Sequence, residues 1–300
     1  MKQILTKMDL FGEKNKKGSQ LASNNINGDL FRYRSKQLNV TKVEQMVQFH
    51  SSVRKEYLME RSAKDRIAII SLQDYCYEAE PKVYEEILDA MKELEYIKEK
   101  VIFKFTDDNE IEDILNYEQL CDGWKKFKPY LKRTEYYKEL EKVSRKGADE
   151  IIESGDTEFA SIKRMIQIYK RGLFYHLLFN KFDVNTKQKL SFLSQAFINI
   201  PIELELNTIV VRENTNEILY RTEGILNKNI LNKDELQRQY DQYYKPLIKY
   251  NFTEYSYRYI IRRTIDKATN VLKEGVVILT EEVKNNIQFI TQYNLNLVDL

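Results

Sequence analysis

Residue types that perform acid–base, nucleophilic or metal chemistry are scarce in this chain. Its 300 residues include two histidines, His50 and His176, and two cysteines, Cys76 and Cys121. These are too few for a zinc ribbon, a three-histidine catalytic site or a disulfide framework. Both histidines lie among apolar residues at helical spacing, which favours structural histidines in a core over catalysts. We therefore predict no metal ion and no cofactor.

The carboxylates offer only an incomplete site. Asp183 with Glu203 and Glu205 has the two-carboxylate pattern of a metal-dependent nuclease, but the residue where that pattern expects a lysine is Leu206 or Asn207. The acidic segment 107–113 lacks the glycine of a calcium loop and is more typical of a helix start. Motifs for phosphate loops, dinucleotide binding, zinc proteases and serine hydrolases are absent from the sequence. An enzyme with an unrecognised carboxylate site is therefore our third hypothesis.

A basic and aromatic segment, 124–137, suggests nucleic-acid binding. Lysines can contact phosphates and aromatic rings can stack on bases. The candidate contacts are Lys125, Lys128, Lys132 and Arg133. However, the spacing of Trp124, Phe127 and Leu131 places these three residues on one helical face, which indicates core packing with the lysines in solvent. A nucleic-acid-binding accessory protein is therefore the alternative function.

Tyrosine and arginine are concentrated near the C-terminus, a composition typical of interface centres. The candidate interface residues are Tyr240, Tyr243, Tyr255, Arg258, Tyr259 and Arg262. In a helix over 253–275, Tyr255 and Tyr259 would share a face with Arg262. A partly buried helix with snorkelling arginines explains the same pattern. The predicted partners are other protein subunits, including copies of this chain.

Charge is divided into blocks, although 48 basic and 46 acidic residues leave a net charge of only +2. Counting gives +7 for residues 1–66, −11 for 67–123, +7 for 124–190 and −1 for 191–300. Opposed blocks either neutralise one another within a monomer or join neighbouring copies head to tail. The sequence leaves both possibilities open.

The elements that would position these residues predict an α+β fold that is predominantly α-helical. Residues 1–29 are rich in Gly, Ser, Asn and Lys and predict a mobile N-terminal arm. Residues 30–185 predict a mainly helical domain. Residues 186–300 predict a smaller mixed region with a β-hairpin and C-terminal helices.

Apolar spacing and capping residues define the predicted helices. They cover 41–57, 62–76, 83–99, 111–131, 134–153, 157–182, 234–247, 253–275 and the residues from 280 onward. The first begins at a Thr41-x-x-Glu44 capping box, and Gly275 would end the eighth. A short buried strand at 67–70 is the alternative for the second. Alternating residues between 201 and 220 predict the hairpin, and 101–105 and 276–279 predict short strands.

Compartment signals are weak. Neither cysteine has a C-x-x-C partner, which indicates reduced thiols. Lys2, Lys7 and Asp9 interrupt the N-terminal apolar residues, unlike a signal peptide. No stretch of 18 uncharged apolar residues is present, so we predict no membrane span. The predicted location is cytoplasmic, or the virion if the chain is viral.

The leading functional hypothesis is a non-enzymatic structural or assembly protein that acts through protein–protein interfaces. No motif identifies a family. A composition rich in Lys, Asn, Ile and Tyr suits an AT-rich genome. A subunit of a phage virion or a secretion-type machine would fit such a chain.

Overall fold

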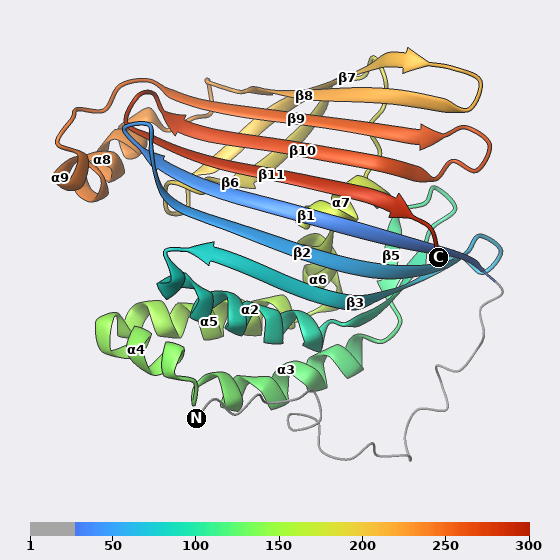
Figure 1. Ribbon diagram of the computed structural model, residues 1–300, viewed down its shortest axis with the longest axis horizontal. Helices are drawn as coiled ribbons and strands as arrows, with labels where there is room; N and C mark the ends of the chain where they lie inside the picture. The colour runs from blue at the N-terminus through green and yellow to red at the C-terminus, as the bar shows by residue number, and fades with distance from the viewer. Residues whose placement is uncertain (1–27) are drawn as a thin grey trace.

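A curved antiparallel sheet forms the frame of the molecule (Figure 1). The computed structural model describes residues 28–300. Within this range, eleven strands are hydrogen-bonded in the order β5-β4-β3-β2-β1-β11-β10-β9-β8-β7-β6. Strands β1 and β11, from opposite ends of the range, are therefore neighbours in the middle of the sheet.

The strands are long and the helices are mostly short. The strands are β1 Asp29–Val43, β2 Met46–Ser62, β3 Ile67–Glu80, β4 Lys100–Phe105, β5 Ile111–Ile114, β6 Gln188–Leu193, β7 Pro201–Glu213, β8 Glu217–Leu226, β9 Tyr255–Asp266, β10 Leu272–Val283 and β11 Ile287–Val298. The helices are the 3-10 turn Lys82–Tyr84, α2 Glu85–Ile97, α3 Tyr117–Leu131, α4 Glu135–Val143, α5 Arg145–Glu158, α6 Ile162–Arg171, α7 Leu173–Phe179, α8 Lys233–Tyr243 and α9 Lys245–Ile248.

The helices divide the sheet into an inner and an outer face. Helices α6 and α7 lie behind the central strands in Figure 1, α2 to α5 lie along the β3 side, and α8 and α9 lie at one end. We call the face that contacts α6 and α7 the inner face. In the view of Figure 1, no helix of the described chain lies in front of the central strands, whose outer face is open.

Alternation along the strands gives the inner face an aromatic lining. Tyr33 of β1 lies opposite Tyr57 of β2, and both are buried. The ring of Tyr57 stacks on Phe174 of α7 with centroids 4.0 Å apart. Helix α7 also approaches β10 closely, because a Cβ on Gly275 would lie 2.8 Å from Leu177. Contacts of this kind fix α7 against the sheet.

The prediction of a predominantly helical fold is wrong. The predicted helices at 41–57, 62–76 and 253–275, and the one from 280 onward, are the long strands β1 to β3 and β9 to β11, with their turns. Gly275 lies within β10 and ends no helix.

The first of these errors has a clear physical cause. The apparent capping box at Thr41 spans the β1–β2 turn, where Glu44 and Gln45 have φ values of 48° and 68°. Two successive positive φ values are typical of a two-residue hairpin turn, which usually contains Asn or Gly. Met46 and Val47, apolar residues of the predicted helix 41–57, are 61% and 55% exposed. The apolar spacing therefore combined exposed strand residues beside the turn with buried residues such as Tyr57.

Other predictions are confirmed. The segment 83–99 contains α2, 101–105 forms most of β4, and the 201–220 hairpin is the β7–β8 pair. The segments 111–131, 134–153 and 157–182 contain α3 to α7, although 111–114 is strand β5. These helices have apolar faces that pack on the sheet or on each other.

The two predicted regions, 30–185 and 186–300, both contribute strands to the one sheet. The boundary between them falls between α7 and β6. The predicted N-terminal arm, 1–29, lies outside the described residues except for Gly28 and Asp29.

A buried carboxylate ties the connection before β7 to the sheet. Glu281 of β10 is 1% exposed and accepts hydrogen bonds from the Ser194 hydroxyl, the Gln195 amide at 2.7 Å and the Tyr255 hydroxyl at 2.8 Å. No basic side chain within the described range forms an ion pair with it. Three donors therefore replace the water that burial removes from this carboxylate.

We expect Glu281→Gln to lower the free energy of unfolding by about 2 kcal/mol, because a neutral amide accepts these bonds more weakly and adds an unpaired donor. Urea unfolding measures the change. Glu274→Gln is the matched control, since Glu274 lies on the same strand but is exposed. A loss no larger than that of the control would contradict the role given to Glu281.

Candidate ligand-binding site

A cavity of about 390 Å³ opens between the sheet and the C-terminal end of α7. Its walls come from strands β1, β2, β8 and β9, the start of β10, and residues 177–184. Three basic side chains line it, Arg61, Lys181 and Arg263, with one acidic side chain, Asp183. We call this space the arginine cavity. Its lining is therefore electropositive.

Arg263 has aromatic neighbours but no carboxylate. Its guanidinium lies 4.1 Å from the ring centroid of Phe182 and 5.8 Å from that of Tyr220. Its Nε is buried and has no hydrogen-bond partner. Within residues 28–300, no carboxylate oxygen lies within 4.0 Å of it. Burial lowers the pKa of Arg263 to about 10, so the side chain stays charged at neutral pH.

Arg61 reaches the same cavity from β2. One of its terminal nitrogens, Nη2, donates to the Asn109 side-chain oxygen at 2.6 Å, and its guanidinium lies 5.9 Å from the Phe105 ring. Burial lowers the pKa of Arg61 as well. This arginine too has no carboxylate partner in the described part of the chain. Two guanidinium groups without counterions thus face one space.

His176 contacts a residue of the cavity lining. Its Nε2 lies 2.6 Å from the Tyr259 hydroxyl, and its Nδ1 contacts the side-chain amide of Asn180, which lines the cavity. Burial lowers the pKa of His176 to about 4, and the positive charge of Arg263 acts in the same direction. The imidazole is therefore neutral at pH 7 and holds Asn180 through a hydrogen bond.

The predicted interface residues do not share one face. Because β9 is a strand, alternate residues point in opposite directions. Tyr255 and Tyr259 are buried on the inner face, whereas Arg258 and Arg262 are exposed on the outer face. On α8, Tyr240 is buried and Tyr243 is 44% exposed. Of the residues on β9, only the two arginines are exposed on a common face, and their role stays a prediction.

The predicted nucleic-acid segment, 124–137, forms the second half of α3, the following turn and the start of α4. Trp124 and Phe127 are buried. Lys125 forms an ion pair with Asp122 at 3.0 Å, and Lys128 forms one with Asp156 at 2.6 Å. Lys132 and Arg133 are exposed at the end of the helix. Nucleic-acid binding by these four residues stays a prediction.

The carboxylates of the nuclease hypothesis have ordinary partners. Glu203 pairs with Lys189 at 3.4 Å, Glu205 pairs with Lys187 at 2.5 Å, and Asp183 accepts a hydrogen bond from Gln188. The described residues contain no group of three His, Cys, Asp or Glu side chains arranged to hold a metal ion. Cys76 and Cys121 are free thiols, and only Cys121 is fully buried.

Sequence reasoning missed both cavity arginines, although a signal was present. In β2, Tyr57 and Met59 point inward, so alternation also directs Arg61 inward. In β9, the buried residues Tyr259 and Ile261 precede Arg263 in the same way. A charged residue at an inward position of an apolar strand is the signal, and it is visible only after the strand is identified.

Sequence comparison finds no match for this chain, and structure comparison finds a distant similarity. No protein-family model and no curated protein matches this sequence. The fold is similar to part of a solved structure that concerns lipid–protein interactions in lipovitellin, with a TM-score of 0.44 and 11% sequence identity. The similarity covers 91% of this chain but only 25% of that chain. At this level it carries no argument about function. None of the helices within residues 28–300 has the length and hydrophobicity to cross a bilayer.

The neutral state of His176 predicts a pH-dependent stability. Its folded-state pKa of about 4 lies below the ordinary value of 6.5, so the unfolded chain binds a proton more readily in between. Stability should therefore fall as pH decreases from 6.5 to 4, by about 3 kcal/mol in all. Unfolding free energies measured from pH 7 to 4.5 should show a steeper slope for the natural chain than for His176→Gln. An unchanged slope in His176→Gln would contradict this assignment.

Proposed function

We propose that this protein is a non-enzymatic binding protein that holds a small polar organic anion in the arginine cavity. The observation that carries the proposal is the presence of two guanidinium groups, Arg61 and Arg263, that face one cavity without a carboxylate partner. Buried charges in folded proteins are normally paired. An anionic ligand would supply the missing partner.

The chemistry of the wall narrows the ligand class. Guanidinium groups bind carboxylate and phosphate oxygens with two parallel hydrogen bonds. Three asparagines, Asn109, Asn180 and Asn270, add amide groups to the same lining. The volume of about 390 Å³ lies within the range of small-molecule sites. These features support a small phosphate ester or polycarboxylate.

Glycerol 3-phosphate and citrate are suitable probes of this site. We expect either or both to raise the Tm in proportion to the logarithm of concentration, because a ligand of the folded state stabilises that state. Arg263→Gln and Arg61→Gln should each weaken binding at least about tenfold, since each loses a charge-assisted hydrogen bond. Isothermal titration calorimetry measures the affinities.

The unliganded variants provide an independent readout. Arg263→Gln removes a buried charge that has no carboxylate partner, so its stability without ligand should equal or exceed that of the natural chain. Arg54→Gln is the matched control, because Arg54 lies on β2 with Arg61 but points to the outer face, where it pairs with Glu78. Equal affinity in the control and in both cavity variants would contradict the proposal.

A second candidate is the assembly role predicted from the sequence. Part of the block charge is neutralised inside one molecule, since Arg54–Glu78, Lys55–Glu95 and Arg66–Asp107 join the first basic block to the acidic block. One observation favours an interface. Arg258 and Arg262 are exposed on the open outer face, and no ion pair holds either of them in the described part of the chain. We infer that an acidic surface of a second copy binds there.

Light scattering over a salt series tests this second candidate. We expect a mass above that of the monomer at low ionic strength and dissociation as salt rises, because exposed ion pairs are screened. Replacing Arg258 and Arg262 by Glu should give a monomer at every salt concentration. Lys126→Glu, an exposed charge reversal on α3, should behave as the natural chain does. A natural chain that is monomeric throughout would contradict self-association.

A further inference from the structure

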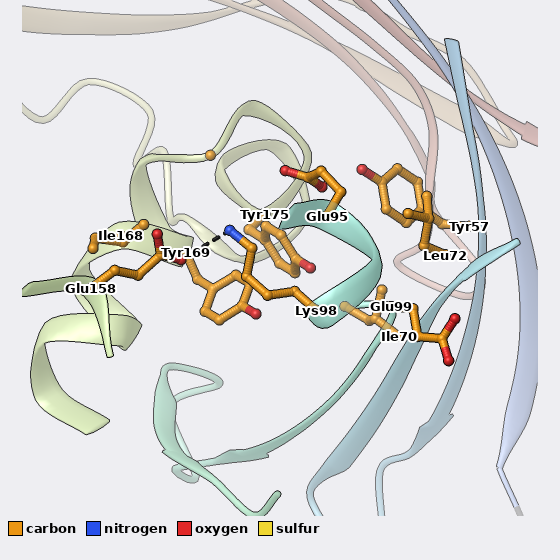
Figure 2. Close-up of a pocket in the computed structure, with 11 residues that line it drawn as sticks. Tyr57, Ile70, Leu72, Glu95, Lys98, Glu99, Glu158, Ile168, Tyr169 and Tyr175 are labelled. Atoms are coloured by element: carbon orange, nitrogen blue, oxygen red, sulfur yellow. Dashed lines mark hydrogen bonds and ion pairs between the residues drawn. The ribbon is translucent and has the colours of Figure 1, made fainter. Parts of the chain in front are cut away.

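A second cavity, of about 180 Å³, lies at the other end of α7 (Figure 2). The end of α2, the end of α5, helix α6 and the start of α7 surround it, and β2 and β3 form its floor. Its lining combines three tyrosines with carboxylates, whereas the arginine cavity is electropositive. We call this space the tyrosine cavity.

Three tyrosine rings form the aromatic part of this wall, Tyr57, Tyr169 and Tyr175. Tyr169 and Tyr175 meet nearly edge to face, with centroids 4.7 Å apart. Burial raises the pKa of all three hydroxyl groups well above the ordinary value, so the rings are neutral at physiological pH. The electron-rich faces of such rings attract cations.

The charged part of the wall carries an ionised carboxylate, Glu95. Burial opposes its charge, but Lys55 and Lys98 outweigh burial and lower its pKa. Lys55 holds one oxygen of Glu95 at 2.8 Å from outside the cavity lining. Lys98 donates to Glu158 at 2.9 Å, so its charge is already paired (Figure 2). A cation in the cavity would therefore lie near two carboxylates, Glu95 and Glu158. The cavity lining contains one lysine, Lys98.

One of the lining tyrosines also has an unpartnered hydroxyl. Tyr169 is 5% exposed, and its hydroxyl has no hydrogen-bond partner. Leaving a buried hydroxyl without a hydrogen bond destabilises the folded state. A ligand with a hydrogen-bond acceptor would satisfy this donor. The hydroxyl is thus an observation independent of the carboxylates, which have lysine partners, and it indicates a missing ligand.

The geometry points to the tyrosine cavity as a binding site for a small organic ammonium ion that also carries a hydroxyl group. The ammonium group would lie against the tyrosine rings and beside Glu95, and the ligand hydroxyl would accept the hydrogen bond of Tyr169. This site is separate from the arginine cavity in both location and charge. The inference is therefore independent of the proposed function.

Choline is the probe that meets both requirements, and 3,3-dimethylbutan-1-ol is its neutral isostere. Calorimetric titration of the full chain should show saturable one-to-one binding of choline and at least about tenfold weaker binding of the isostere, because only choline carries the charge. Equal binding of the two, or binding of neither, would overturn the inference.

Two variants separate the roles of the lining residues. Glu95→Gln keeps the shape of the side chain and should weaken choline binding about tenfold. Tyr169→Phe keeps the ring and removes the hydroxyl, so it should weaken choline binding but leave tetramethylammonium binding unchanged. Unchanged choline affinity in Glu95→Gln would overturn the electrostatic part of the inference, and an equal effect of Tyr169→Phe on both cations would overturn the hydroxyl contact.

Glu86→Gln is the matched control for the charge change. Glu86 lies on the same helix as Glu95 but is exposed in the first turn, away from the cavity. Its choline affinity should equal that of the natural chain. Urea unfolding of each variant shows whether the fold is retained, and Tyr169→Phe, the mildest change, keeps the test decisive if Glu95→Gln does not fold.

Discussion

The fold depends on one constraint, which is that the sheet must bury its inner face. An antiparallel sheet is stable when one face packs on a core and the other meets water. Here α7 provides much of that cover, through the stacking of Phe174 on Tyr57 and the close approach of Leu177 to Gly275. The helix is short, so the cover ends near its two termini. Both cavities lie at these ends, where the sheet and the helical layer separate.

The sequence predicted most of the helices but few of the long strands. Segments such as α2 and α3 have apolar residues at helical spacing because one face is buried. In contrast, β1 and β2 join through Glu44 and Gln45, residue types that do not indicate a hairpin turn. Long strands also carry apolar residues on both faces, such as Leu38 and Val40 on the outer face of β1, which obscures the period of two. The pairing between β1 and β11 was harder still to predict, because it joins residues about 250 positions apart in the sequence.

The candidate sites were harder to predict than the fold. Arg61 and Arg263 become neighbours of one cavity only through the sheet order, since six strands separate β2 from β9 in the chain. For the clustered tyrosines of 240–262, the sequence showed the residue types but not the direction in which each side chain points. Their frequency was visible in the sequence, but strand alternation places Tyr255 and Tyr259 in the core and leaves Arg258 and Arg262 outside. Composition identified the residue types, and only topology assigned their positions.

The arrangement of α7 relates the two cavities to each other. Tyr175, near its start, lines the tyrosine cavity, and Leu177 and Phe179, near its end, line the arginine cavity. Phe174, next to Tyr175, is fixed against Tyr57, and His176, which lies between Tyr175 and Leu177, is fixed by Tyr259. Because close-packed interiors leave little room for displacement, α7 forms a common wall of the two cavities that its packing holds in place. The aromatic contacts that hold α7 therefore set how far each cavity can adjust to a ligand.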